Sequence, residues 1–382
     1  MFGRQYQGFV KLYMVYDRYY YSKFNDLKKT VYKKIYTAFE RFEKEICFNI
    51  GTLTVEDVCR VIFAINLDNP HLFYVDFGNI RIKTLLGMIV VSVAYFYNQN
   101  EVAQIQPKIQ KATNAILKRV QGTTAYEKVL SLHDVLADNI LYDDNAAEKI
   151  DKYYLKSNTI LGVLFFKTAV CEGISKTFKY LLNLIDIKCL IVIGDTDESA
   201  QKGYKHAWNI VKIDDASYHV DLTWDVNRSF PNAISHAYFC LSDENAMKTH
   251  SWKGQEVPAC VGKKNYYTQN GLIAQNDFDV CRIIDNACSQ GRLAVEIQTD
   301  VIKSIDEYAD LCMRTIKHHS HTKAAVEIGM DVESKIIQFR WALRGEGFQR
   351  KQQSKNIILA QNKKERIGMF DRIKNFFDKF KK

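Results

Sequence analysis

The stretch "TAVCEGISKTFKYLL", residues 168–182, places a cysteine at the start of a predicted amphipathic helix. Downstream of Cys171, apolar residues recur at steps of three and four: Ile174, Phe178, Leu181, Leu182 and Ile185. This spacing puts them on one helical face, with Cys171 in the first turn. The pattern therefore predicts a helix that begins at the cysteine and packs through one face.

A cysteine at a helix N-terminus has two interpretations. The helix dipole and the free N–H groups of the first turn stabilise a thiolate, whose pKa there can fall to roughly 3.5–7.5. The same N–H groups can hold the oxyanion of a tetrahedral intermediate. Cysteine is also among the most buried residue types, so Cys171 could equally be a small core residue. Position alone leaves both interpretations open.

A nucleophilic cysteine needs a base, and the base needs an orienting partner. The stretch "KHAWNIVKIDDASYHVDLTWDV", residues 205–226, predicts a β-hairpin that turns at residues 214–215. A two-residue turn would set Ile213 opposite Ala216.

That register places Asp221 opposite Trp208 and diagonally beside His206, about 7–8 Å away at the backbone. A carboxylate there can fix the tautomer of the His206 ring by accepting its N–H. Trp208 and Trp224 flank the pair and are expected to pack the sheet and keep water out. His219 is expected on the opposite face, in a structural role.

The three motifs "AVCEGIS", "HAWN" and "HVDLTWD", in this order, resemble those of bacterial transglutaminase-like proteins of the papain-like cysteine superfamily. The upstream "EKVLSLHDVLADNILYD" resembles the helix that precedes the cysteine segment in that family. The resemblance implies a helix bearing Cys171 packed on an antiparallel sheet. It also implies that Cys171 is the nucleophile, His206 the general base and acid, and Asp221 the orienting carboxylate.

Two features depart from the family pattern. The chain has the apolar "GVLFFKTAV" where the family usually has a glycine-containing turn, and Ile174 stands where an aromatic residue is usual.

One donor to the oxyanion is expected to be the Cys171 backbone N–H. Tyr153, Tyr154 and Asn158 are the candidates for the second donor and for the substrate groove.

The 382 residues divide in our prediction into four parts. Residues 1–124 form a mainly helical region, 125–255 the transglutaminase-like core, 256–344 a small α/β piece, and 345–382 a linker with a basic helix. The fold class is α+β. Periodicity predicts helices at 24–46, after Thr54, and at 107–121, 124–143 and 304–319, and strands at 71–77, 88–97, 292–298 and 335–343.

Composition excludes several classes of protein. The net charge of +9 is spread among interleaved charges, so nucleic acid is not an expected partner. Nine cysteines without a CxxC pair indicate reduced thiols and no zinc ribbon. The "HHSH" at 318–321 is expected to cap a helix or face solvent. We predict no metal and no cofactor, because HExxH, GxGxxG and phosphate-loop motifs are missing.

The N-terminal stretch has no signal-peptide core, and the most apolar run of the chain, residues 85–97, is too short for a membrane span. A cytoplasmic location is therefore expected, although the sequence leaves open a secretion route that needs no signal. In residues 363–382 phenylalanines gather on one side of a basic helix. Such a helix can lie on a membrane or in a partner's groove, or it can pack on its own protein.

These observations predict a cysteine enzyme that forms a thioester with a peptide or glutamine carbonyl of a protein or peptide substrate. Water as acceptor gives a protease or deamidase, and a lysine amine gives a cross-linker. Hydrolysis is preferred because water needs no second binding site. The alternative is a binding or scaffold module that kept the papain-like fold without turnover.

Overall fold

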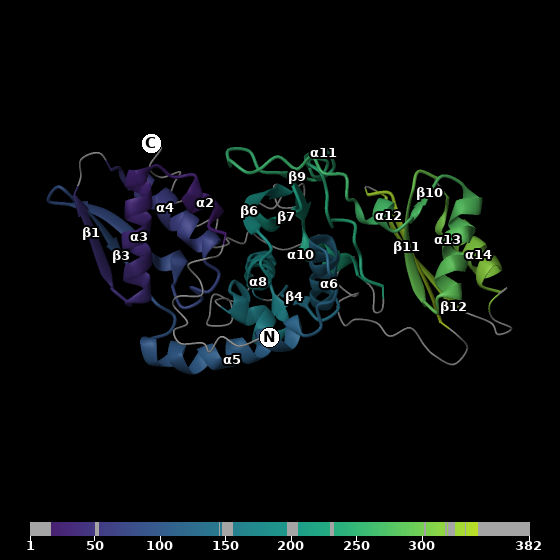
Figure 1. Ribbon diagram of the computed structural model, residues 1–382, viewed down its shortest axis with the longest axis horizontal. Coiled ribbons are helices and arrows are strands. Elements are labelled where there is room, and N and C mark those ends of the chain that lie inside the picture. Colours follow the sequence, from purple (N-terminus) through teal and green to yellow (C-terminus); the bar gives the residue numbers. More distant parts are fainter. Residues whose placement is uncertain are drawn as a thin grey trace.

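The computed structural model describes residues 17–49, 53–144, 146, 156–196, 205–229, 233–301, 303–317, 319, 325–332 and 334–342. Three groups of elements follow one another along its longest axis: an N-terminal group, a central group and a C-terminal group (Figure 1). Helices and strands occur in all three, which confirms the α+β class. Within these residues, no helix combines the length and the apolarity needed to cross a membrane.

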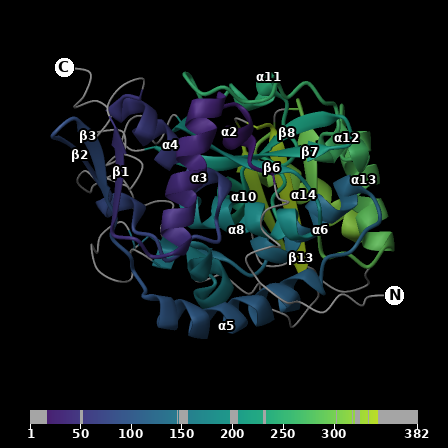
Figure 2. The same cartoon turned by 60° about the vertical axis from the view of Figure 1, so that its left-hand side comes forward.

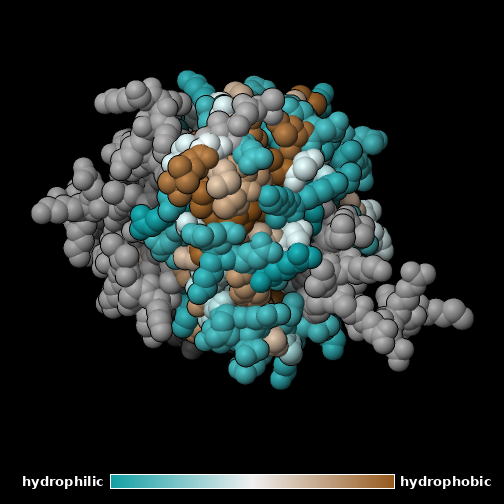
Figure 3. All heavy atoms as spheres, turned by 90° about the vertical axis from the view of Figure 1, so that its left-hand side faces the viewer, coloured by the Kyte–Doolittle hydropathy of each residue, from teal (hydrophilic) through white to brown (hydrophobic). Residues whose placement is uncertain are grey.

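The N-terminal group combines helices with a small antiparallel sheet in the order β1-β3-β2. Its elements are α2 (Tyr19–Ser22), α3 (Asp26–Glu40), β1 (Glu45–Asn49), α4 (Val55–Asp68), a 3₁₀ turn (Phe77–Asn79), β2 (Arg81–Leu85), β3 (Met88–Ser92) and α5 (Gln99–Leu117). On the face of the molecule at this end, apolar side chains emerge among hydrophilic ones (Figure 3). Leu85 and Leu86, at the β2–β3 turn, are 49% and 89% exposed.

The strand predicted at 71–77 is wrong. The structure has turns there, with an isolated bridge between Val75 and Tyr95, and residues 72–77 are all buried. A short apolar run that is buried on every side has no period by which a strand can be recognised. Strand β2 was not predicted, because its residues are mostly exposed and show no apolar alternation. The strand predicted at 88–97 is real only over β3.

Side-chain caps set the starts of the two long helices that follow. Thr54 and Asp57 form a capping box before α4, where the sequence predicts a helix start. A second box, formed by Asn98 and Glu101, starts α5 upstream of the predicted boundary, so Pro107 lies inside the helix instead of at its start. In both cartoon views α5 runs beneath the N-terminal and central groups (Figures 1 and 2).

The central group carries a four-stranded sheet in the order β8-β7-β6-β9. Its elements are α6 (Ala125–Ala137), β4 (Leu141–Tyr142), the π-helical turn η3 (Gly162–Phe166), β5 (Thr168–Ala169), α8 (Cys171–Leu184), β6 (Cys189–Thr196), β7 (His206–Ile213), β8 (Ala216–Val220), α10 (Leu222–Arg228), α11 (Asp243–Ala246) and β9 (His250–Ser251). Ile213 pairs with Ala216 across the β7–β8 turn, which confirms the predicted register.

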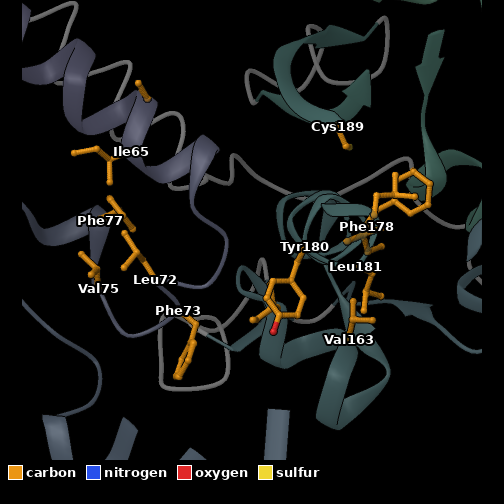
Figure 4. Packing of buried hydrophobic residues seen from close by; sticks show 14 of the residues in the cluster. Ile65, Leu72, Phe73, Val75, Phe77, Val163, Phe178, Tyr180, Leu181 and Cys189 are labelled. Atoms are coloured by element: carbon orange, nitrogen blue, oxygen red, sulfur yellow. The ribbon is translucent and has the colours of Figure 1, made fainter. Parts of the chain in front are cut away.

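One hydrophobic core joins the N-terminal and central groups. It runs from Val31 of α3 to Cys240, and Figure 4 shows members from both sides, among them Ile65 of α4 and Phe178 of α8. Because this apolar cluster is continuous, the two groups pack as one body. The boundary at residue 124 between two separate domains stays a prediction.

The C-terminal group is a sheet in the order β10-β11-β13-β12, with two helices on the side away from the central group (Figure 1). Its elements are α12 (Tyr266–Gln269), β10 (Ile273–Ala274), α13 (Asp277–Ser289), β11 (Ala294–Thr299), α14 (Ile305–Ile316), β12 (Ala325–Asp331) and β13 (Ile336–Ala342). The predicted strands at 292–298 and 335–343 and the helix at 304–319 correspond to β11, β13 and α14. The linker and basic helix at 345–382 lie outside the described residues.

The alternation in β13 predicts a half-buried strand, but all seven of its residues are buried. Its polar side chains are paired: the Gln338 amide donates to Glu296 at 2.7 Å, and Arg340 lies 3.5 Å from Glu327. Glu296 also accepts from His236 of the central group, with Nδ1 to Oε2 at 2.9 Å. The polar face of this sheet therefore docks on the central group, where solvent was expected.

This docking contact predicts a pH-dependent stability. The buried His236 ring also contacts Asp134, with Nε2 to Oδ1 at 2.9 Å. Burial disfavours the charged ring, but Asp134 and Glu296 outweigh it and raise the pKa of His236 to about 10. An unfolded histidine has a pKa of about 6.5. The contribution of His236 to the free energy of unfolding is therefore full below about pH 6.5 and is lost as the pH rises towards 10.

We expect the midpoint of thermal unfolding to differ most between wild type and His236→Gln near pH 6, and the difference to shrink towards pH 10. Calorimetry across this range measures it. His219→Gln is the control of opposite sign, since burial lowers the pKa of the folded His219 to about 4, below the unfolded value of about 6.5, so its difference from wild type should grow as the pH rises above 6. A difference for His236→Gln that stays constant with pH would contradict the assignment.

Candidate active site

Cys171 is the first residue of α8, preceded by Val170 as its N-cap. The first intrahelical bond runs from the Ile174 N–H to the Val170 carbonyl at 3.0 Å. The N–H groups of residues 171–173 precede that bond and have no intrahelical acceptor. The first turn thus presents the positive end of the helix dipole and backbone donors beside the thiol.

The close packing at position 173 explains why the motif "CEGIS" has a glycine there. A Cβ atom at this position would lie 2.1 Å from the Ser157 carbonyl oxygen, which is too close for any other residue. The same carbonyl accepts the Val170 N–H at 3.2 Å. The segment around Ser157 is therefore held directly against the start of α8. Asn158, one of the candidates for the second oxyanion donor, is the next residue and is buried.

Two hydrogen bonds fix α8 to β7. The Ser175 hydroxyl donates to the Ala207 carbonyl at 2.9 Å, and the Asn209 amide donates to the Ser175 carbonyl at 3.1 Å. His206, which precedes Ala207, is therefore held next to the N-terminus of α8. Sequence reasoning missed the part played by Asn209, although it is the last residue of the "HAWN" motif.

His206 and Asp221 form a buried pair, with His206 Nε2 2.6 Å from Asp221 Oδ2. Asp221 is also the N-cap of α10, since its Oδ1 accepts the Trp224 N–H at 3.1 Å. Burial opposes the charge on both groups. The attraction between the groups outweighs it, raises the pKa of His206 to about 10 and holds the pKa of Asp221 well below its usual range.

Cys171 also acts on the His206 ring. A hydrogen bond and the charge of the Cys171 side chain contribute to the raised pKa of His206, after the larger effects of burial and Asp221. Because Nε2 is engaged with Asp221, Nδ1 is the ring nitrogen that has no contact with this carboxylate. The structure thus brings together the three residues predicted for the triad.

Trp208 and Trp224 lie beside this pair. The Trp208 ring is fully buried and nearly parallel to the His206 ring, with centroids 6.0 Å apart. Trp224 is partly buried, and its ring centroid lies 6.1 Å from that of His206. The Arg228 guanidinium lies over the Trp224 ring, 4.5 Å from its centroid. Their predicted role in packing and in water exclusion agrees with these positions and stays a prediction.

The position predicted for His219 is wrong. Residues two apart in a strand share a face, so His219 lies on the same side as Asp221. Trp208 Nε1 donates to His219 Nδ1 at 3.0 Å, and His219 Nε2 lies 2.8 Å from Asp243. The structural role predicted for His219 stays a prediction. Tyr153 and Tyr154 lie outside the described residues.

The N-terminal group covers part of the site. Cys171, itself partly buried, packs against a small buried cluster that includes Leu67 of α4 and Ile191 of β6. Next to it, Glu172 is 2% exposed and pairs with Lys176 at 2.7 Å, while Lys176 donates to Asn66 of α4 at 2.8 Å. Burial raises the pKa of Glu172 against the opposing effect of Lys176. The sequence did not predict this cover over the cysteine.

A second histidine, His250 of β9, contacts the same carboxylate. Its Nε2 lies 3.0 Å from Asp221 Oδ2, and it is buried. It reaches the site because β9 pairs with β6 in the register Thr196–His250. Sequence reasoning missed it, since an isolated "HS" pair in a turn-rich stretch gives no signal.

Three sets of described side chains bring metal-type donor atoms within 4.8 Å of one another. They are His206, Asp221 and His250; His133, Asp134 and His236; and His219, Asp243 and Cys260. Hydrogen bonds within each set account for this convergence, so we assign none of them to a metal. His319, the described histidine of the "HHSH" stretch, pairs with Asp285 at 2.5 Å.

Comparison with known proteins finds a family match over part of this chain. Residues 114–222 match the model of the transglutaminase-like superfamily. The human kyphoscoliosis peptidase is 26% identical over 137 residues, which cover 34% of this chain and 20% of that protein. The chain thus spans about a fifth of the length of this relative.

Two solved structures are also similar. One is a TGase crystal structure, with a TM-score of 0.28 at 18% identity, covering 47% of this chain and 50% of that one. The other is a candidate cysteine protease from Cytophaga hutchinsonii, with a TM-score of 0.27 at 13% identity, covering 49% and 80%. The segment that matches the transglutaminase-like superfamily model, residues 114–222, includes Cys171, His206 and Asp221.

Proposed function

We propose that this protein is a transglutaminase-like cysteine enzyme that acts on peptide or glutamine carbonyls through Cys171, His206 and Asp221. The observation that carries the proposal is the 2.6 Å His206–Asp221 pair beside the helix that begins with Cys171. A nucleophile, a base and an orienting carboxylate are the three parts that acyl transfer to cysteine needs.

In the first half-reaction, the Cys171 thiolate attacks the carbonyl carbon and the π electrons move to the oxygen. The Cys171 backbone N–H stabilises this oxyanion, and Asn158 is our candidate for a second donor. The intermediate collapses as the C–N bond breaks, and His206 gives its proton to the leaving amine. In the second half-reaction, His206 takes a proton from water, the hydroxide oxygen bonds to the thioester carbon, and the C–S bond breaks to restore the thiolate.

Hydrolysis remains our preference over cross-linking. Water needs no binding site of its own, and a relative similar to about a third of this chain is named a peptidase. The proposed substrate is a protein or peptide. The contact of residues 363–382 with a membrane or a partner is also a proposal, and these residues lie outside the described part of the structure.

Incubation with a library of glutamine-containing peptides and a primary amine tests the function, with mass spectrometry of the peptides as the readout. We expect shortened or deamidated peptides from wild type, and unchanged peptides from Cys171→Ala. Amine incorporation would favour cross-linking. Peptides left unchanged by wild type, with Cys171 never acylated, would favour the binding or scaffold module instead.

A further inference from the structure

Asp221 carries one hydrogen bond more than an orienting carboxylate requires. Its Oδ1 accepts the Trp224 N–H, and its Oδ2 contacts both His206 Nε2 at 2.6 Å and His250 Nε2 at 3.0 Å. Two imidazoles thus converge on a single oxygen of a buried anion.

The protons of this cluster follow from its contacts. Asp221 is ionised and accepts, so both Nε2 atoms must carry protons. On its other side, His250 Nδ1 lies 2.8 Å from the Thr249 hydroxyl, which can donate to an unprotonated nitrogen. Burial lowers the pKa of His250 despite the opposing effect of Asp221. His250 is therefore a neutral donor, and the positive charge resides on His206.

The His250 ring is held by its surroundings. Its centroid lies 4.7 Å from Trp224, 4.9 Å from Trp208 and 5.7 Å from Tyr238. The charged and titratable groups that act on it are Asp221, His206 and Arg228. Gly194 of β6 makes room for this arrangement, because a Cβ there would lie 2.2 Å from the Ser251 carbonyl oxygen and 2.5 Å from the Trp208 ring.

We propose that His250 is a positioning residue that holds the Asp221 carboxylate against His206 and so extends the triad to four residues. The inference rests on the proposed function and deepens it. Without His250, Oδ2 keeps one partner, and the carboxylate can turn about its Cβ–Cγ bond towards the vacated space. Its hold on the His206 proton then weakens. A neutral donor is suited to this role because it adds no second positive charge that would compete with His206.

The test compares His250→Ala, His250→Gln and the control His219→Gln with wild type. His219 is a buried histidine on the same sheet that hydrogen-bonds Asp243 instead of Asp221. Selective ¹⁵N labelling of histidine and NMR titration measure the proton affinity of His206. Peptide mass spectrometry measures the rate at which iodoacetamide alkylates Cys171 near pH 6.

In His250→Ala we expect His206 to bind its proton about tenfold more weakly, which corresponds to one pKa unit. Cys171 alkylation near pH 6 should stay within about twofold of wild type, because His206 remains protonated there. The amide of His250→Gln can still donate to Oδ2 and should restore the proton affinity of His206 within about twofold. Thr249→Val, which leaves the ring in place without its hydroxyl partner, should weaken that affinity by less than His250→Ala. It also serves where His250→Ala does not fold.

An unchanged His206 proton affinity in folded His250→Ala would overturn the inference, as would an equal loss in His219→Gln. A different result would contradict the proposed function, namely a Cys171 alkylation rate that is the same in wild type and in His206→Ala. The titration of His206 needs no turnover and decides the role of His250 in either case.

Discussion

Replacing Cys171 with alanine is expected to remove acyl transfer entirely, by a factor of roughly a million relative to wild type. The variant has no atom that can form the thioester, and the neighbouring donors cannot replace it. The fold should persist, because the side chain is small and only partly buried; the free energy of unfolding should fall by about 1 kcal/mol.

Peptide turnover and urea unfolding check this prediction together. Cys189→Ala is a matched control, because Cys189 is a buried thiol on β6 whose pKa burial raises to about 12. That control should keep its activity. Residual turnover by folded Cys171→Ala would show that another group carries out the chemistry.

His206→Ala is expected to lose nearly as much activity, because members of a catalytic unit are not additive. The variant should also be less stable. Removing one partner of a buried ion pair costs about 3–5 kcal/mol, since Asp221 would remain charged with fewer donors. Turnover and denaturant unfolding measure the two effects separately.

Asp221→Asn is the informative companion to His206→Ala. It leaves the ring and the nucleophile in place and removes the orienting charge, so it should retain more activity than His206→Ala. A His206→Ala variant with wild-type turnover would remove His206 from the mechanism. An Asp221→Asn variant less active than His206→Ala would assign the carboxylate more than an orienting role.

Local patterns were enough to predict the helix and the hairpin that carry the candidate site. The spacing after Cys171 predicted α8, and a two-residue turn at 214–215 predicted the pairing of Ile213 with Ala216. These features depend on residues near one another in sequence, where helical period and hairpin register are strong signals. His206 pairs with Asp221, and hydrogen bonds of Ser175 and Asn209 fix β7 to α8, the helix that begins with Cys171.

Features that depend on distant packing were not predictable. The polar residues of β13 suggested a solvent-facing side, yet they are buried because Glu296 and His236 join two groups of the fold. His250 reaches Asp221 only through the pairing of β9 with β6. The cover over Cys171 comes from α4, more than a hundred residues upstream. Such contacts leave no periodic trace in the sequence.

The pH dependence of Cys171 alkylation in wild type and His206→Ala tests the central claim most directly. Exposed Cys47 serves as a reference thiol within the same samples, and buried thiols such as Cys59, whose pKa burial raises to about 12, should contribute little. We predict that wild-type Cys171 reacts rapidly well below pH 7, whereas in His206→Ala its rate at the same pH falls towards that of the exposed reference thiol Cys47. Coincident curves for the two proteins from about pH 5 to pH 9 would show that Cys171 and His206 form no ion pair, and would contradict the account.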